Sequence, residues 1–146
     1  MQAETGRSRW VLWALLVGSV LVAPWILWNC GTGEASAVPW RTDFGAAIDE
    51  ARESGKPVLV GFTAAWCPPC KVMKREVWPD PDVGAAAAGY VPVLIDVDAP
   101  GNAAVTRRYG VRGIPTILIL DAEGRVLREG GFMSRADMIE FLANEA

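Results

Sequence analysis

Two cysteines separated by two prolines are the residues of this chain best suited to chemistry. The stretch AAWCPPCKVM, residues 64–73, contains Cys67 and Cys70 with Pro68 and Pro69 between them. A CxxC pair of this kind can cycle between dithiol and disulfide, supply half of a metal site, or form a permanent crosslink. A permanent crosslink is disfavoured, because a disulfide that closes so short a loop removes little chain entropy.

The amino-acid composition narrows these choices. The chain contains no histidine, so Ser–His–Asp and Cys–His catalysis lack their general base and Cys₂His₂ zinc sites lack two ligands. Its three cysteines are Cys30, Cys67 and Cys70, and no second CxxC completes a Cys₄ zinc site. A metal cluster shared between two copies of the chain remains an alternative; otherwise we expect no metal and no cofactor.

Length and charge bound the architecture and the partners. The 146 residues leave room for one ordinary domain plus an appendage. The net charge is −3, and acidic and basic residues are interspersed without a basic block. Nucleic acid therefore has no electrostatic reason to bind, and we expect no nucleic-acid partner.

The position of the cysteines within a helix would give them different roles. If a helix begins at Pro68 or Pro69, Cys67 lies at its N-terminal edge, where free amide groups and the helix dipole stabilise a thiolate. The pKa of Cys67 is then expected below the free value of about 8.5, and Cys67 is expected to be the exposed, attacking thiol. Cys70 lies one turn later, turned inward, and suits the resolving role. The prolines stiffen the helix start, and Lys71 adds positive charge, although a simply solvated lysine is the alternative.

The hydrophobic pattern predicts helices that alternate with short strands. The expected strands are apolar runs bounded by turn residues, at 57–63, 90–97, 116–120 and 125–129. The expected helices are 42–54, 68–79, 83–88, 102–109 and 134–146. Thr42 and Ser134 are the expected N-caps, and Gly55 and Gly110 are the expected stops.

The order of these elements predicts an α/β fold. The first strands are joined by helices, which implies parallel crossovers, and the last two are joined by a tight turn, which implies an antiparallel edge. The result is a mixed sheet with helices on both faces.

Two motifs at the expected places in this order carry a family resemblance. WCPPCK, residues 66–71, resembles the active-site motif of the thioredoxin superfamily, and YGVRGIPT, residues 109–116, resembles its cis-proline segment. The resemblance covers residues 40–146 and implies the thioredoxin fold. The stretch GKPVLVGFTAAWCPPC followed by VWPDPDV is most similar to an extracytoplasmic branch, which includes the C-terminal domain of the bacterial transmembrane thiol:disulfide interchange reductase.

The resemblance assigns further site residues. It implies that the bond before Pro115 is cis, that Pro115 lies against the cysteine pair, and that the backbone of Ile114 pairs with an extended partner segment. It also implies that Trp66 offers a flat apolar contact beside Cys67; a plain packing residue is the alternative.

One departure from the family concerns proton transfer. Thioredoxins carry a buried aspartate where this chain has Gly61, and their neighbouring lysine is missing from the matching region 92–94. Proton transfer at Cys70 therefore has no evident side-chain mediator.

An apolar segment precedes the domain. Residues 10–28 contain no charged side chain, and these 19 residues span about 28 Å as a helix, close to the ~30 Å core of a bilayer. Arg7 and Arg9 precede the segment, which places residues 1–9 in the cytoplasm by the positive-inside rule. We expect an uncleaved transmembrane anchor at 10–28, a linker at 29–39 and the domain at 40–146. A signal sequence cleaved after the A-x-A pattern at 35–37 is the alternative, and the role of Cys30 stays open.

These observations together predict a function. We expect a membrane-tethered thiol:disulfide oxidoreductase of the bacterial inner membrane, with its domain in the periplasm and protein thiols or disulfides as partners. The branch resemblance favours reduction and implies a membrane electron donor. The alternatives are a binding or chaperone module with incidental cysteines, and a protein that holds a soft ion such as Cu(I) on the CxxC pair.

Overall fold

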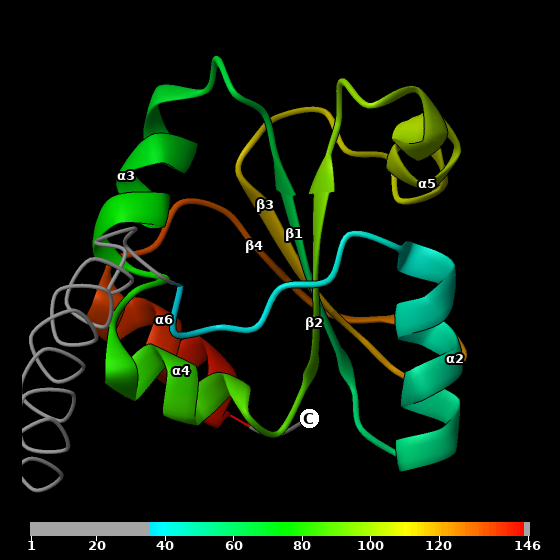
Figure 1. Ribbon diagram of the computed structural model, residues 1–146, viewed down its shortest axis with the longest axis horizontal. Helices are drawn as coiled ribbons and strands as arrows, with labels where there is room; N and C mark the ends of the chain where they lie inside the picture. Colours follow the sequence, from blue (N-terminus) through cyan, green and yellow to red (C-terminus); the bar gives the residue numbers. More distant parts are fainter. Residues whose placement is uncertain (1–35, 145–146) are drawn as a thin grey trace, which may run out of the picture. The chain divides into compact units, whose positions relative to one another are not determined.

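The computed structural model describes residues 36–144 and contains one mixed four-stranded sheet (Figure 1). The strands are β1 (Val58–Thr63), β2 (Val91–Asp96), β3 (Thr116–Leu120) and β4 (Val126–Gly130). The helices are α2 (Phe44–Ser54), α3 (Pro68–Glu76), α4 (Pro81–Ala87), the short 3₁₀ helix η1 (Pro100–Asn102), α5 (Ala103–Arg108) and α6 (Arg135–Ala143). The sheet with flanking helices confirms the predicted thioredoxin fold.

The strands lie in the order β2-β1-β3-β4. β1 and β2 are parallel, as predicted, whereas β3 runs antiparallel to β1 and β4 antiparallel to β3. The predicted parallel crossover between β2 and β3 is therefore wrong. The connection of residues 97–115 contains no helix of strand length: α5 rises only about 9 Å, whereas a strand spans about 20 Å, so the crossover helix of a parallel unit is missing.

Alternating side chains of the sheet form two apolar cores. On the face covered by α3, α4 and α6, Leu59 and Ile117 pack with Met73 and Trp78. On the face covered by α2 and α5, the neighbouring strand residues pack with α2; the buried members of this second core include Val58, Val60, Phe62, Leu118, Leu120 and Ile48. Every second strand residue thus packs against α3, and this packing holds the helix and its cysteines on one face of the sheet.

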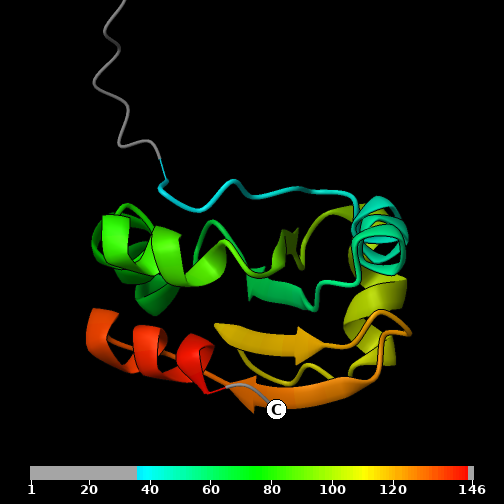
Figure 2. The same ribbon diagram turned by 90° about the horizontal axis from the view of Figure 1, so that it is seen from below.

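The two edges of the sheet differ. Figure 2 shows the segment that leads into α2 running along the β2 edge, with β4 at the opposite edge. Arg41 pairs with β2 there, because its N–H donates to the Pro92 carbonyl and its own carbonyl accepts from Leu94. Within residues 36–144, β4 pairs only with β3.

Residues 36–38 pack against the C-terminal end of α3. The Ala37 N–H donates to the carbonyl of Trp78 over 2.8 Å, and the Ser36 hydroxyl donates to the same oxygen over 3.3 Å. Val38 is buried, and the Cα of Gly84 in α4 lies so close that an added Cβ would sit 2.8 Å from the Cβ of Ala37. This stretch falls in the range that the sequence assigns to a linker, and it is part of the packed domain.

Most helix ends lie within one residue of the predictions. The exceptions are the N-cap of α2, the start of α4, and the ends of α3 and α6, which fall at Glu76 and Ala143 instead of residues 79 and 146. Asp43, not Thr42, caps α2 by accepting from the Ala46 N–H. The helix therefore begins at Phe44, one residue later than a Thr42 cap would place it. α4 begins at Pro81, two residues before the predicted start, because the Asp80 carboxylate accepts from the first amides of the helix. Ser134 forms the expected capping box with Asp137.

The predicted anchor at 10–28, its flanking residues and Cys30 lie outside the described residues. Of the helices within residues 36–144, none has both the length and the apolar character that crossing a membrane requires.

Candidate active site

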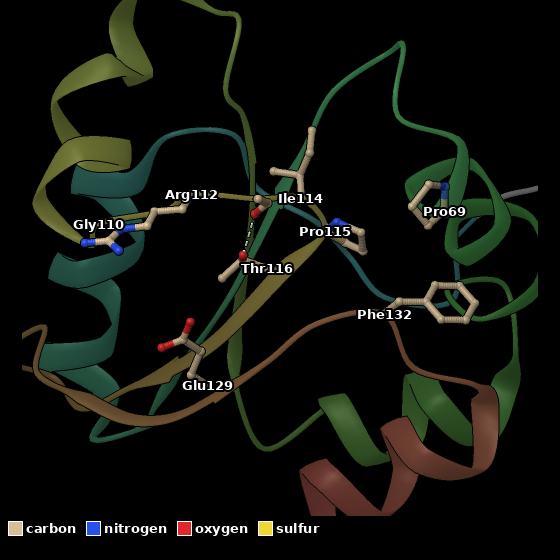
Figure 3. Close-up of a pocket in the computed structure, with 9 residues that line it drawn as sticks. Pro69, Gly110, Arg112, Ile114, Pro115, Thr116, Glu129 and Phe132 are labelled. Carbon is tan, nitrogen blue, oxygen red and sulfur yellow. Dashed lines mark hydrogen bonds between the residues drawn. The ribbon is translucent and has the colours of Figure 1, made fainter.

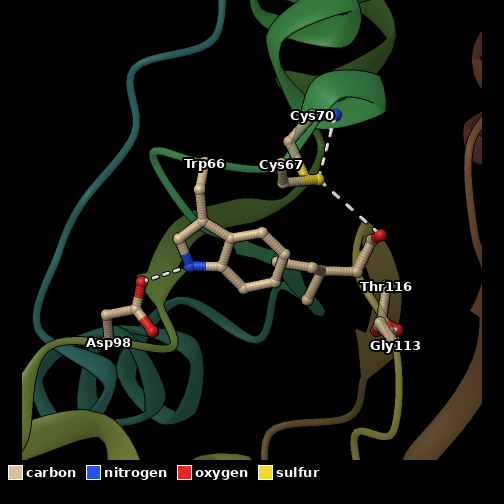
Figure 4. Close-up of a disulfide and its surroundings, with 7 residues drawn as sticks. Trp66, Cys67, Cys70, Asp98, Gly113 and Thr116 are labelled. Atoms are coloured by element: carbon tan, nitrogen blue, oxygen red, sulfur yellow. Dashed lines mark hydrogen bonds between the residues drawn. A yellow bond between two sulfur atoms is a disulfide. The ribbon is translucent and has the colours of Figure 1, made fainter.

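Cys67 and Cys70 form a disulfide at the N-terminus of α3 (Figure 4). Cys67 is the N-cap, and its Sγ accepts a hydrogen bond from the Cys70 N–H over 3.2 Å. Pro68 and Pro69 occupy the first two helical positions, where an amide hydrogen has no partner within the helix anyway. The chain reaches this point directly from the end of β1, so the buried strand and the two prolines together fix the position of the disulfide.

Burial does not separate the two cysteines as the sequence predicts. Cys67 was expected to be the exposed thiol, yet in this disulfide form it is 1% exposed and Cys70 is 6% exposed. The reason is that Val97 and Ile114 pack against the pair from neighbouring loops. What distinguishes the two sulfurs is the helix: the sulfur of Cys67 receives an amide hydrogen from the first turn.

The loop before β3 supplies the opposing contact. The Ile114–Pro115 bond is cis, as the resemblance implies. The carbonyl oxygen of Ile114 lies 3.7 Å from the Sγ of Cys67. In a reduced site this oxygen would accept a hydrogen from a Cys67 thiol, whereas the Cys70 amide stabilises a Cys67 thiolate. The two contacts therefore act in opposite directions on the protonation of Cys67.

Trp66 stands beside the disulfide and is 63% exposed. Such exposure argues against the alternative of a core-packing residue. Its indole N–H donates to the carboxylate of Asp98 over 2.7 Å (Figure 4). Asp98 follows β2 and is itself held by a hydrogen bond from its N–H to the carboxylate of Asp96. Sequence reasoning missed Asp98, because no local pattern reports a contact between residues 32 positions apart.

The surroundings of Gly61, where thioredoxins carry the buried aspartate, are side chains of apolar and aromatic residues. An added Cβ at Gly61 would lie 3.0 Å from Leu94, 3.6 Å from Trp40 and 3.7 Å from Ile117. In the part of the chain that the structure describes, no polar or charged residue is buried. A carboxylate inside the domain is therefore not available to take a proton from Cys70. Lys71 is exposed and forms no ion pair with another described residue.

A groove of about 680 Å³ runs along the cis-proline loop (Figure 3). Residues 113–116 line it, and there the Thr116 hydroxyl donates to the Gly113 carbonyl over 2.7 Å. The other lining residues are Pro69, Gly110, Arg112, Glu129 and Phe132. Of the predicted site residues, Pro69, Ile114 and Pro115 therefore meet at this groove. Sequence reasoning missed Phe132, although an apolar residue after two glycines in a loop was a usable signal.

No cluster of three or more histidine, cysteine, aspartate or glutamate side chains that could hold a metal ion occurs in residues 36–144. The fold, the CxxC disulfide at a helix N-terminus and the adjacent cis-proline together define a thiol:disulfide oxidoreductase of the thioredoxin class.

Comparison with known proteins places the chain in a family. A family model described as "Thioredoxin-like domain" matches residues 44–146. The chain therefore belongs to the thioredoxin-like domain family.

Similar proteins include a thiol:disulfide interchange protein. The chain is 40% identical over 81 residues to thiol:disulfide interchange protein DsbD 1 of Pseudomonas aeruginosa, a match over 54% of this chain and 14% of that protein. The chain thus spans only about a seventh of the length of this curated relative.

Two solved structures resemble the domain. The oxidised DsbD C-terminal domain of Neisseria meningitidis is 29% identical with a TM-score of 0.61, over 70% of this chain and 95% of that one. A thioredoxin from Thermus thermophilus is 29% identical with a TM-score of 0.64, over 73% of this chain and 85% of that one.

Proposed function

We propose that this protein is a membrane-tethered, extracytoplasmic thiol:disulfide reductase that acts on protein disulfides. The observation that carries the proposal is the Cys67–Cys70 disulfide at the N-terminus of α3, with the Sγ of Cys67 3.7 Å from the Ile114 carbonyl oxygen. A partner sulfur that reaches Cys67 also reaches the open backbone of the cis-proline loop.

The reaction begins at Cys67. Its thiolate, stabilised by the Cys70 N–H, attacks one sulfur of a partner disulfide. A mixed disulfide forms between Cys67 and the partner, and the second partner sulfur leaves as a thiolate.

Cys70 completes the exchange. Its thiolate attacks the Sγ of Cys67, re-forms the disulfide seen here and releases the remaining partner sulfur. Two electrons pass from the domain to the partner, and the partner thiolates take up the protons that Cys67 and Cys70 lose. Since the described interior offers no carboxylate, the leaving thiolate or water is the acceptor of the Cys70 proton.

The direction of exchange and the location of the protein are inferred from the sequence. The resemblance of the stretch GKPVLVGFTAAWCPPC to the extracytoplasmic reductase branch favours the reductive direction, and a dithiol donor in the membrane would then restore the reduced form. The uncharged segment 10–28 after Arg7 and Arg9 supports an anchor in the bacterial inner membrane with the domain in the periplasm.

The proposal is tested by insulin reduction with the 146-residue chain in detergent and dithiothreitol as the donor. We expect wild type and the matched control Cys30→Ser to accelerate the reduction, and Cys67→Ser to be inactive. Equal activity of Cys67→Ser and wild type would remove the enzymatic function and favour a binding module. A glutathione equilibrium tests the direction, since a reductase is expected to have a potential more negative than about −180 mV.

A further inference from the structure

We propose that three arginines beside the cis-proline loop, Arg107, Arg108 and Arg112, form a docking surface for proteins that carry acidic side chains next to the disulfide to be reduced. The inference rests on the proposed function and specifies the charge of the protein partners that the same site accepts.

The first observation is the distribution of charge along the chain. The protein as a whole has a net charge of −3. Residues 99–120, which include α5, the cis-proline loop and β3, nevertheless contain Arg107, Arg108 and Arg112 and no acidic residue. A purely cationic segment therefore leads into the loop that contacts Cys67.

The second observation is that these three side chains lack the partners that other arginines have. All three are exposed, and none forms an ion pair with another residue of the range 36–144. Every other arginine of this range is engaged, because Arg41, Arg52, Arg75, Arg125 and Arg135 form ion pairs and Arg128 donates to the carbonyl of Phe141. The three exceptions follow one another along the chain, so their charges are available to a ligand as a group.

The third observation is that the backbone carrying these arginines is packed. Val105 and Tyr109 lie against the second core, and the Tyr109 hydroxyl donates to the Gly124 carbonyl over 2.9 Å. The guanidinium carbon of Arg108 lies 5.6 Å from the centre of the Tyr109 ring, which leaves the N–H groups at its edge exposed. A charged surface on a packed backbone requires less ordering when a partner binds.

The fourth observation is the short path from Arg112 to the reacting sulfur. Arg112 precedes Ile114 by two residues, and the carbonyl oxygen of Ile114 lies 3.7 Å from the Sγ of Cys67. Two extended residues separate Cα atoms by at most ~7 Å, so the Cα of Arg112 lies within roughly 13 Å of this sulfur. Figure 3 shows the Arg112 side chain directed away from Pro115 and toward Gly110, which follows α5. A partner bonded to Cys67 therefore brings the residues near its own cysteine to the arginines.

An acidic polypeptide is the occupant that fits these features. Guanidinium groups keep their charge at every physiological pH and bind carboxylates through paired N–H···O hydrogen bonds. Glu129, which lines the same groove as Arg112, forms no ion pair with it and so leaves the guanidinium to a ligand. An anionic membrane carries the same sign of charge, but a membrane on this side would crowd Cys67, which must stay open to its partner.

The test uses two peptide disulfides of equal length as substrates of the 146-residue chain in detergent. Glutamates flank the cysteine in one and lysines in the other, and each rate is divided by the rate with dithiothreitol alone. We expect wild type to prefer the glutamate peptide in kcat/KM by about tenfold at an ionic strength of ~0.01 M. The preference should fall below about threefold at ~0.3 M, because salt screens exposed charges.

Two sets of variants locate the effect. Arg107→Gln/Arg108→Gln/Arg112→Gln should lose the preference, and the corresponding triple change to glutamate should favour the lysine peptide. The matched control changes the net charge by the same amount at exposed positions of α2 and α3 and should keep the preference; it is Arg52→Gln/Lys74→Gln/Arg75→Gln.

The uncharged 2-hydroxyethyl disulfide separates docking from reactivity. All variants should reduce it within about twofold of wild type, since the charges are distant from the sulfur. A parallel loss with this compound and with the peptides would assign the arginines to the Cys67 thiolate and overturn the inference.

Three further outcomes are decisive. A wild-type chain without preference, or a triple glutamine variant that keeps it, overturns the inference and leaves the proposed function standing. A difference between wild type and this variant that appears only in vesicles containing phosphatidylglycerol, and equally for both peptides, assigns the arginines to the membrane and overturns it too. A chain that exchanges with neither the peptides nor the small disulfide overturns both proposals.

Discussion

The two ends of α3 serve opposite purposes. At its N-terminal end the disulfide meets an exposed tryptophan, a carbonyl oxygen and an open groove. At its C-terminal end Trp78 packs edge-to-face on Trp40, with ring centroids 4.9 Å apart, and its carbonyl accepts from Ser36 and Ala37. The N-terminal end, which we call the reactive end, therefore adjoins an exposed ring and an open groove. The C-terminal end, which we call the holding end, is closed by packing.

This difference suggests how a nine-residue helix can present a reactive pair. Such a short helix is marginal by itself, so its stability must come from tertiary packing. The packing is concentrated away from the sulfurs, at Met73, Val77 and Trp78. This division would be contradicted if a substitution at one end of α3 changed both the exchange rate and the free energy of unfolding.

The largest effect on activity is expected from substituting Cys67 or Cys70. Cys67→Ser should abolish insulin reduction, because it removes the sulfur that the Cys70 amide stabilises as a thiolate. Cys70→Ser should instead accumulate a mixed disulfide with the partner, visible as a higher-mass band on a non-reducing gel. Accumulation in Cys67→Ser rather than Cys70→Ser would reverse the assigned roles.

A second prediction addresses the holding end. Gly84→Val places a side chain against Ala37, where an added Cβ would lie 2.8 Å from the Ala37 Cβ and 2.9 Å from its carbonyl oxygen. We expect the free energy of unfolding to fall by about 1–3 kcal/mol through overpacking, as measured by urea denaturation. Gly89→Val, where an added Cβ meets nothing within 4 Å, is the control. A parallel loss of exchange rate in the folded protein would contradict the division between the two ends.

A third prediction addresses the reactive end. Asp98→Ala removes the acceptor of the Trp66 N–H and frees the indole. We expect kcat/KM for a protein disulfide to fall about fivefold, the equivalent of one hydrogen bond. The rate with 2-hydroxyethyl disulfide and the free energy of unfolding should not change. Asp98→Asn keeps an acceptor oxygen and should recover most of the activity; a loss of stability in place of the kinetic effect would assign Asp98 to the fold.

The smallest effect is expected on stability at low pH, through the protonation of Asp80 beside the holding end. Partial burial raises the pKa of Asp80, but hydrogen bonds from the Val83 amide, the Arg135 guanidinium and the Asp82 amide outweigh it, so the pKa lies below the usual 3.8. The carboxylate therefore adds stability above about pH 3.8 that is lost as the pH falls through the lowered pKa. Urea midpoints of wild type and Asp80→Asn should differ slightly at pH 7 and converge below pH ~3.8. A gap that persists at low pH would exclude this role of the charge.

Local patterns predicted most of the fold. β3 lies at the predicted residues 116–120, and β1 begins one residue later than expected, since both are apolar runs bounded by glycine or proline. The start of α3 followed from its prolines, and the start of α6 from the capping box of Ser134. Each of these features is decided by neighbours in the sequence.

The missed features depend on distant neighbours. The direction of β3 depends on the position that the chain has reached after the short helix α5. The burial of Cys67 depends on Val97 and Ile114, which pack over it. The partner of Trp66 comes from the loop after β2. Sequence identified the reacting sulfurs and the cis-proline loop, whereas the residues that orient and flank them needed three-dimensional information.

The hydrogen bond from Ala37 to the carbonyl of Trp78 also decides where mechanical load enters the domain. A pull transmitted along the chain through residue 36 is resisted first at the C-terminal end of α3. The disulfide lies at the other end of the nine-residue helix, roughly 13 Å away. Tension on the N-terminal side of the domain thus acts on the contacts of Trp78, which do not include the reacting sulfurs.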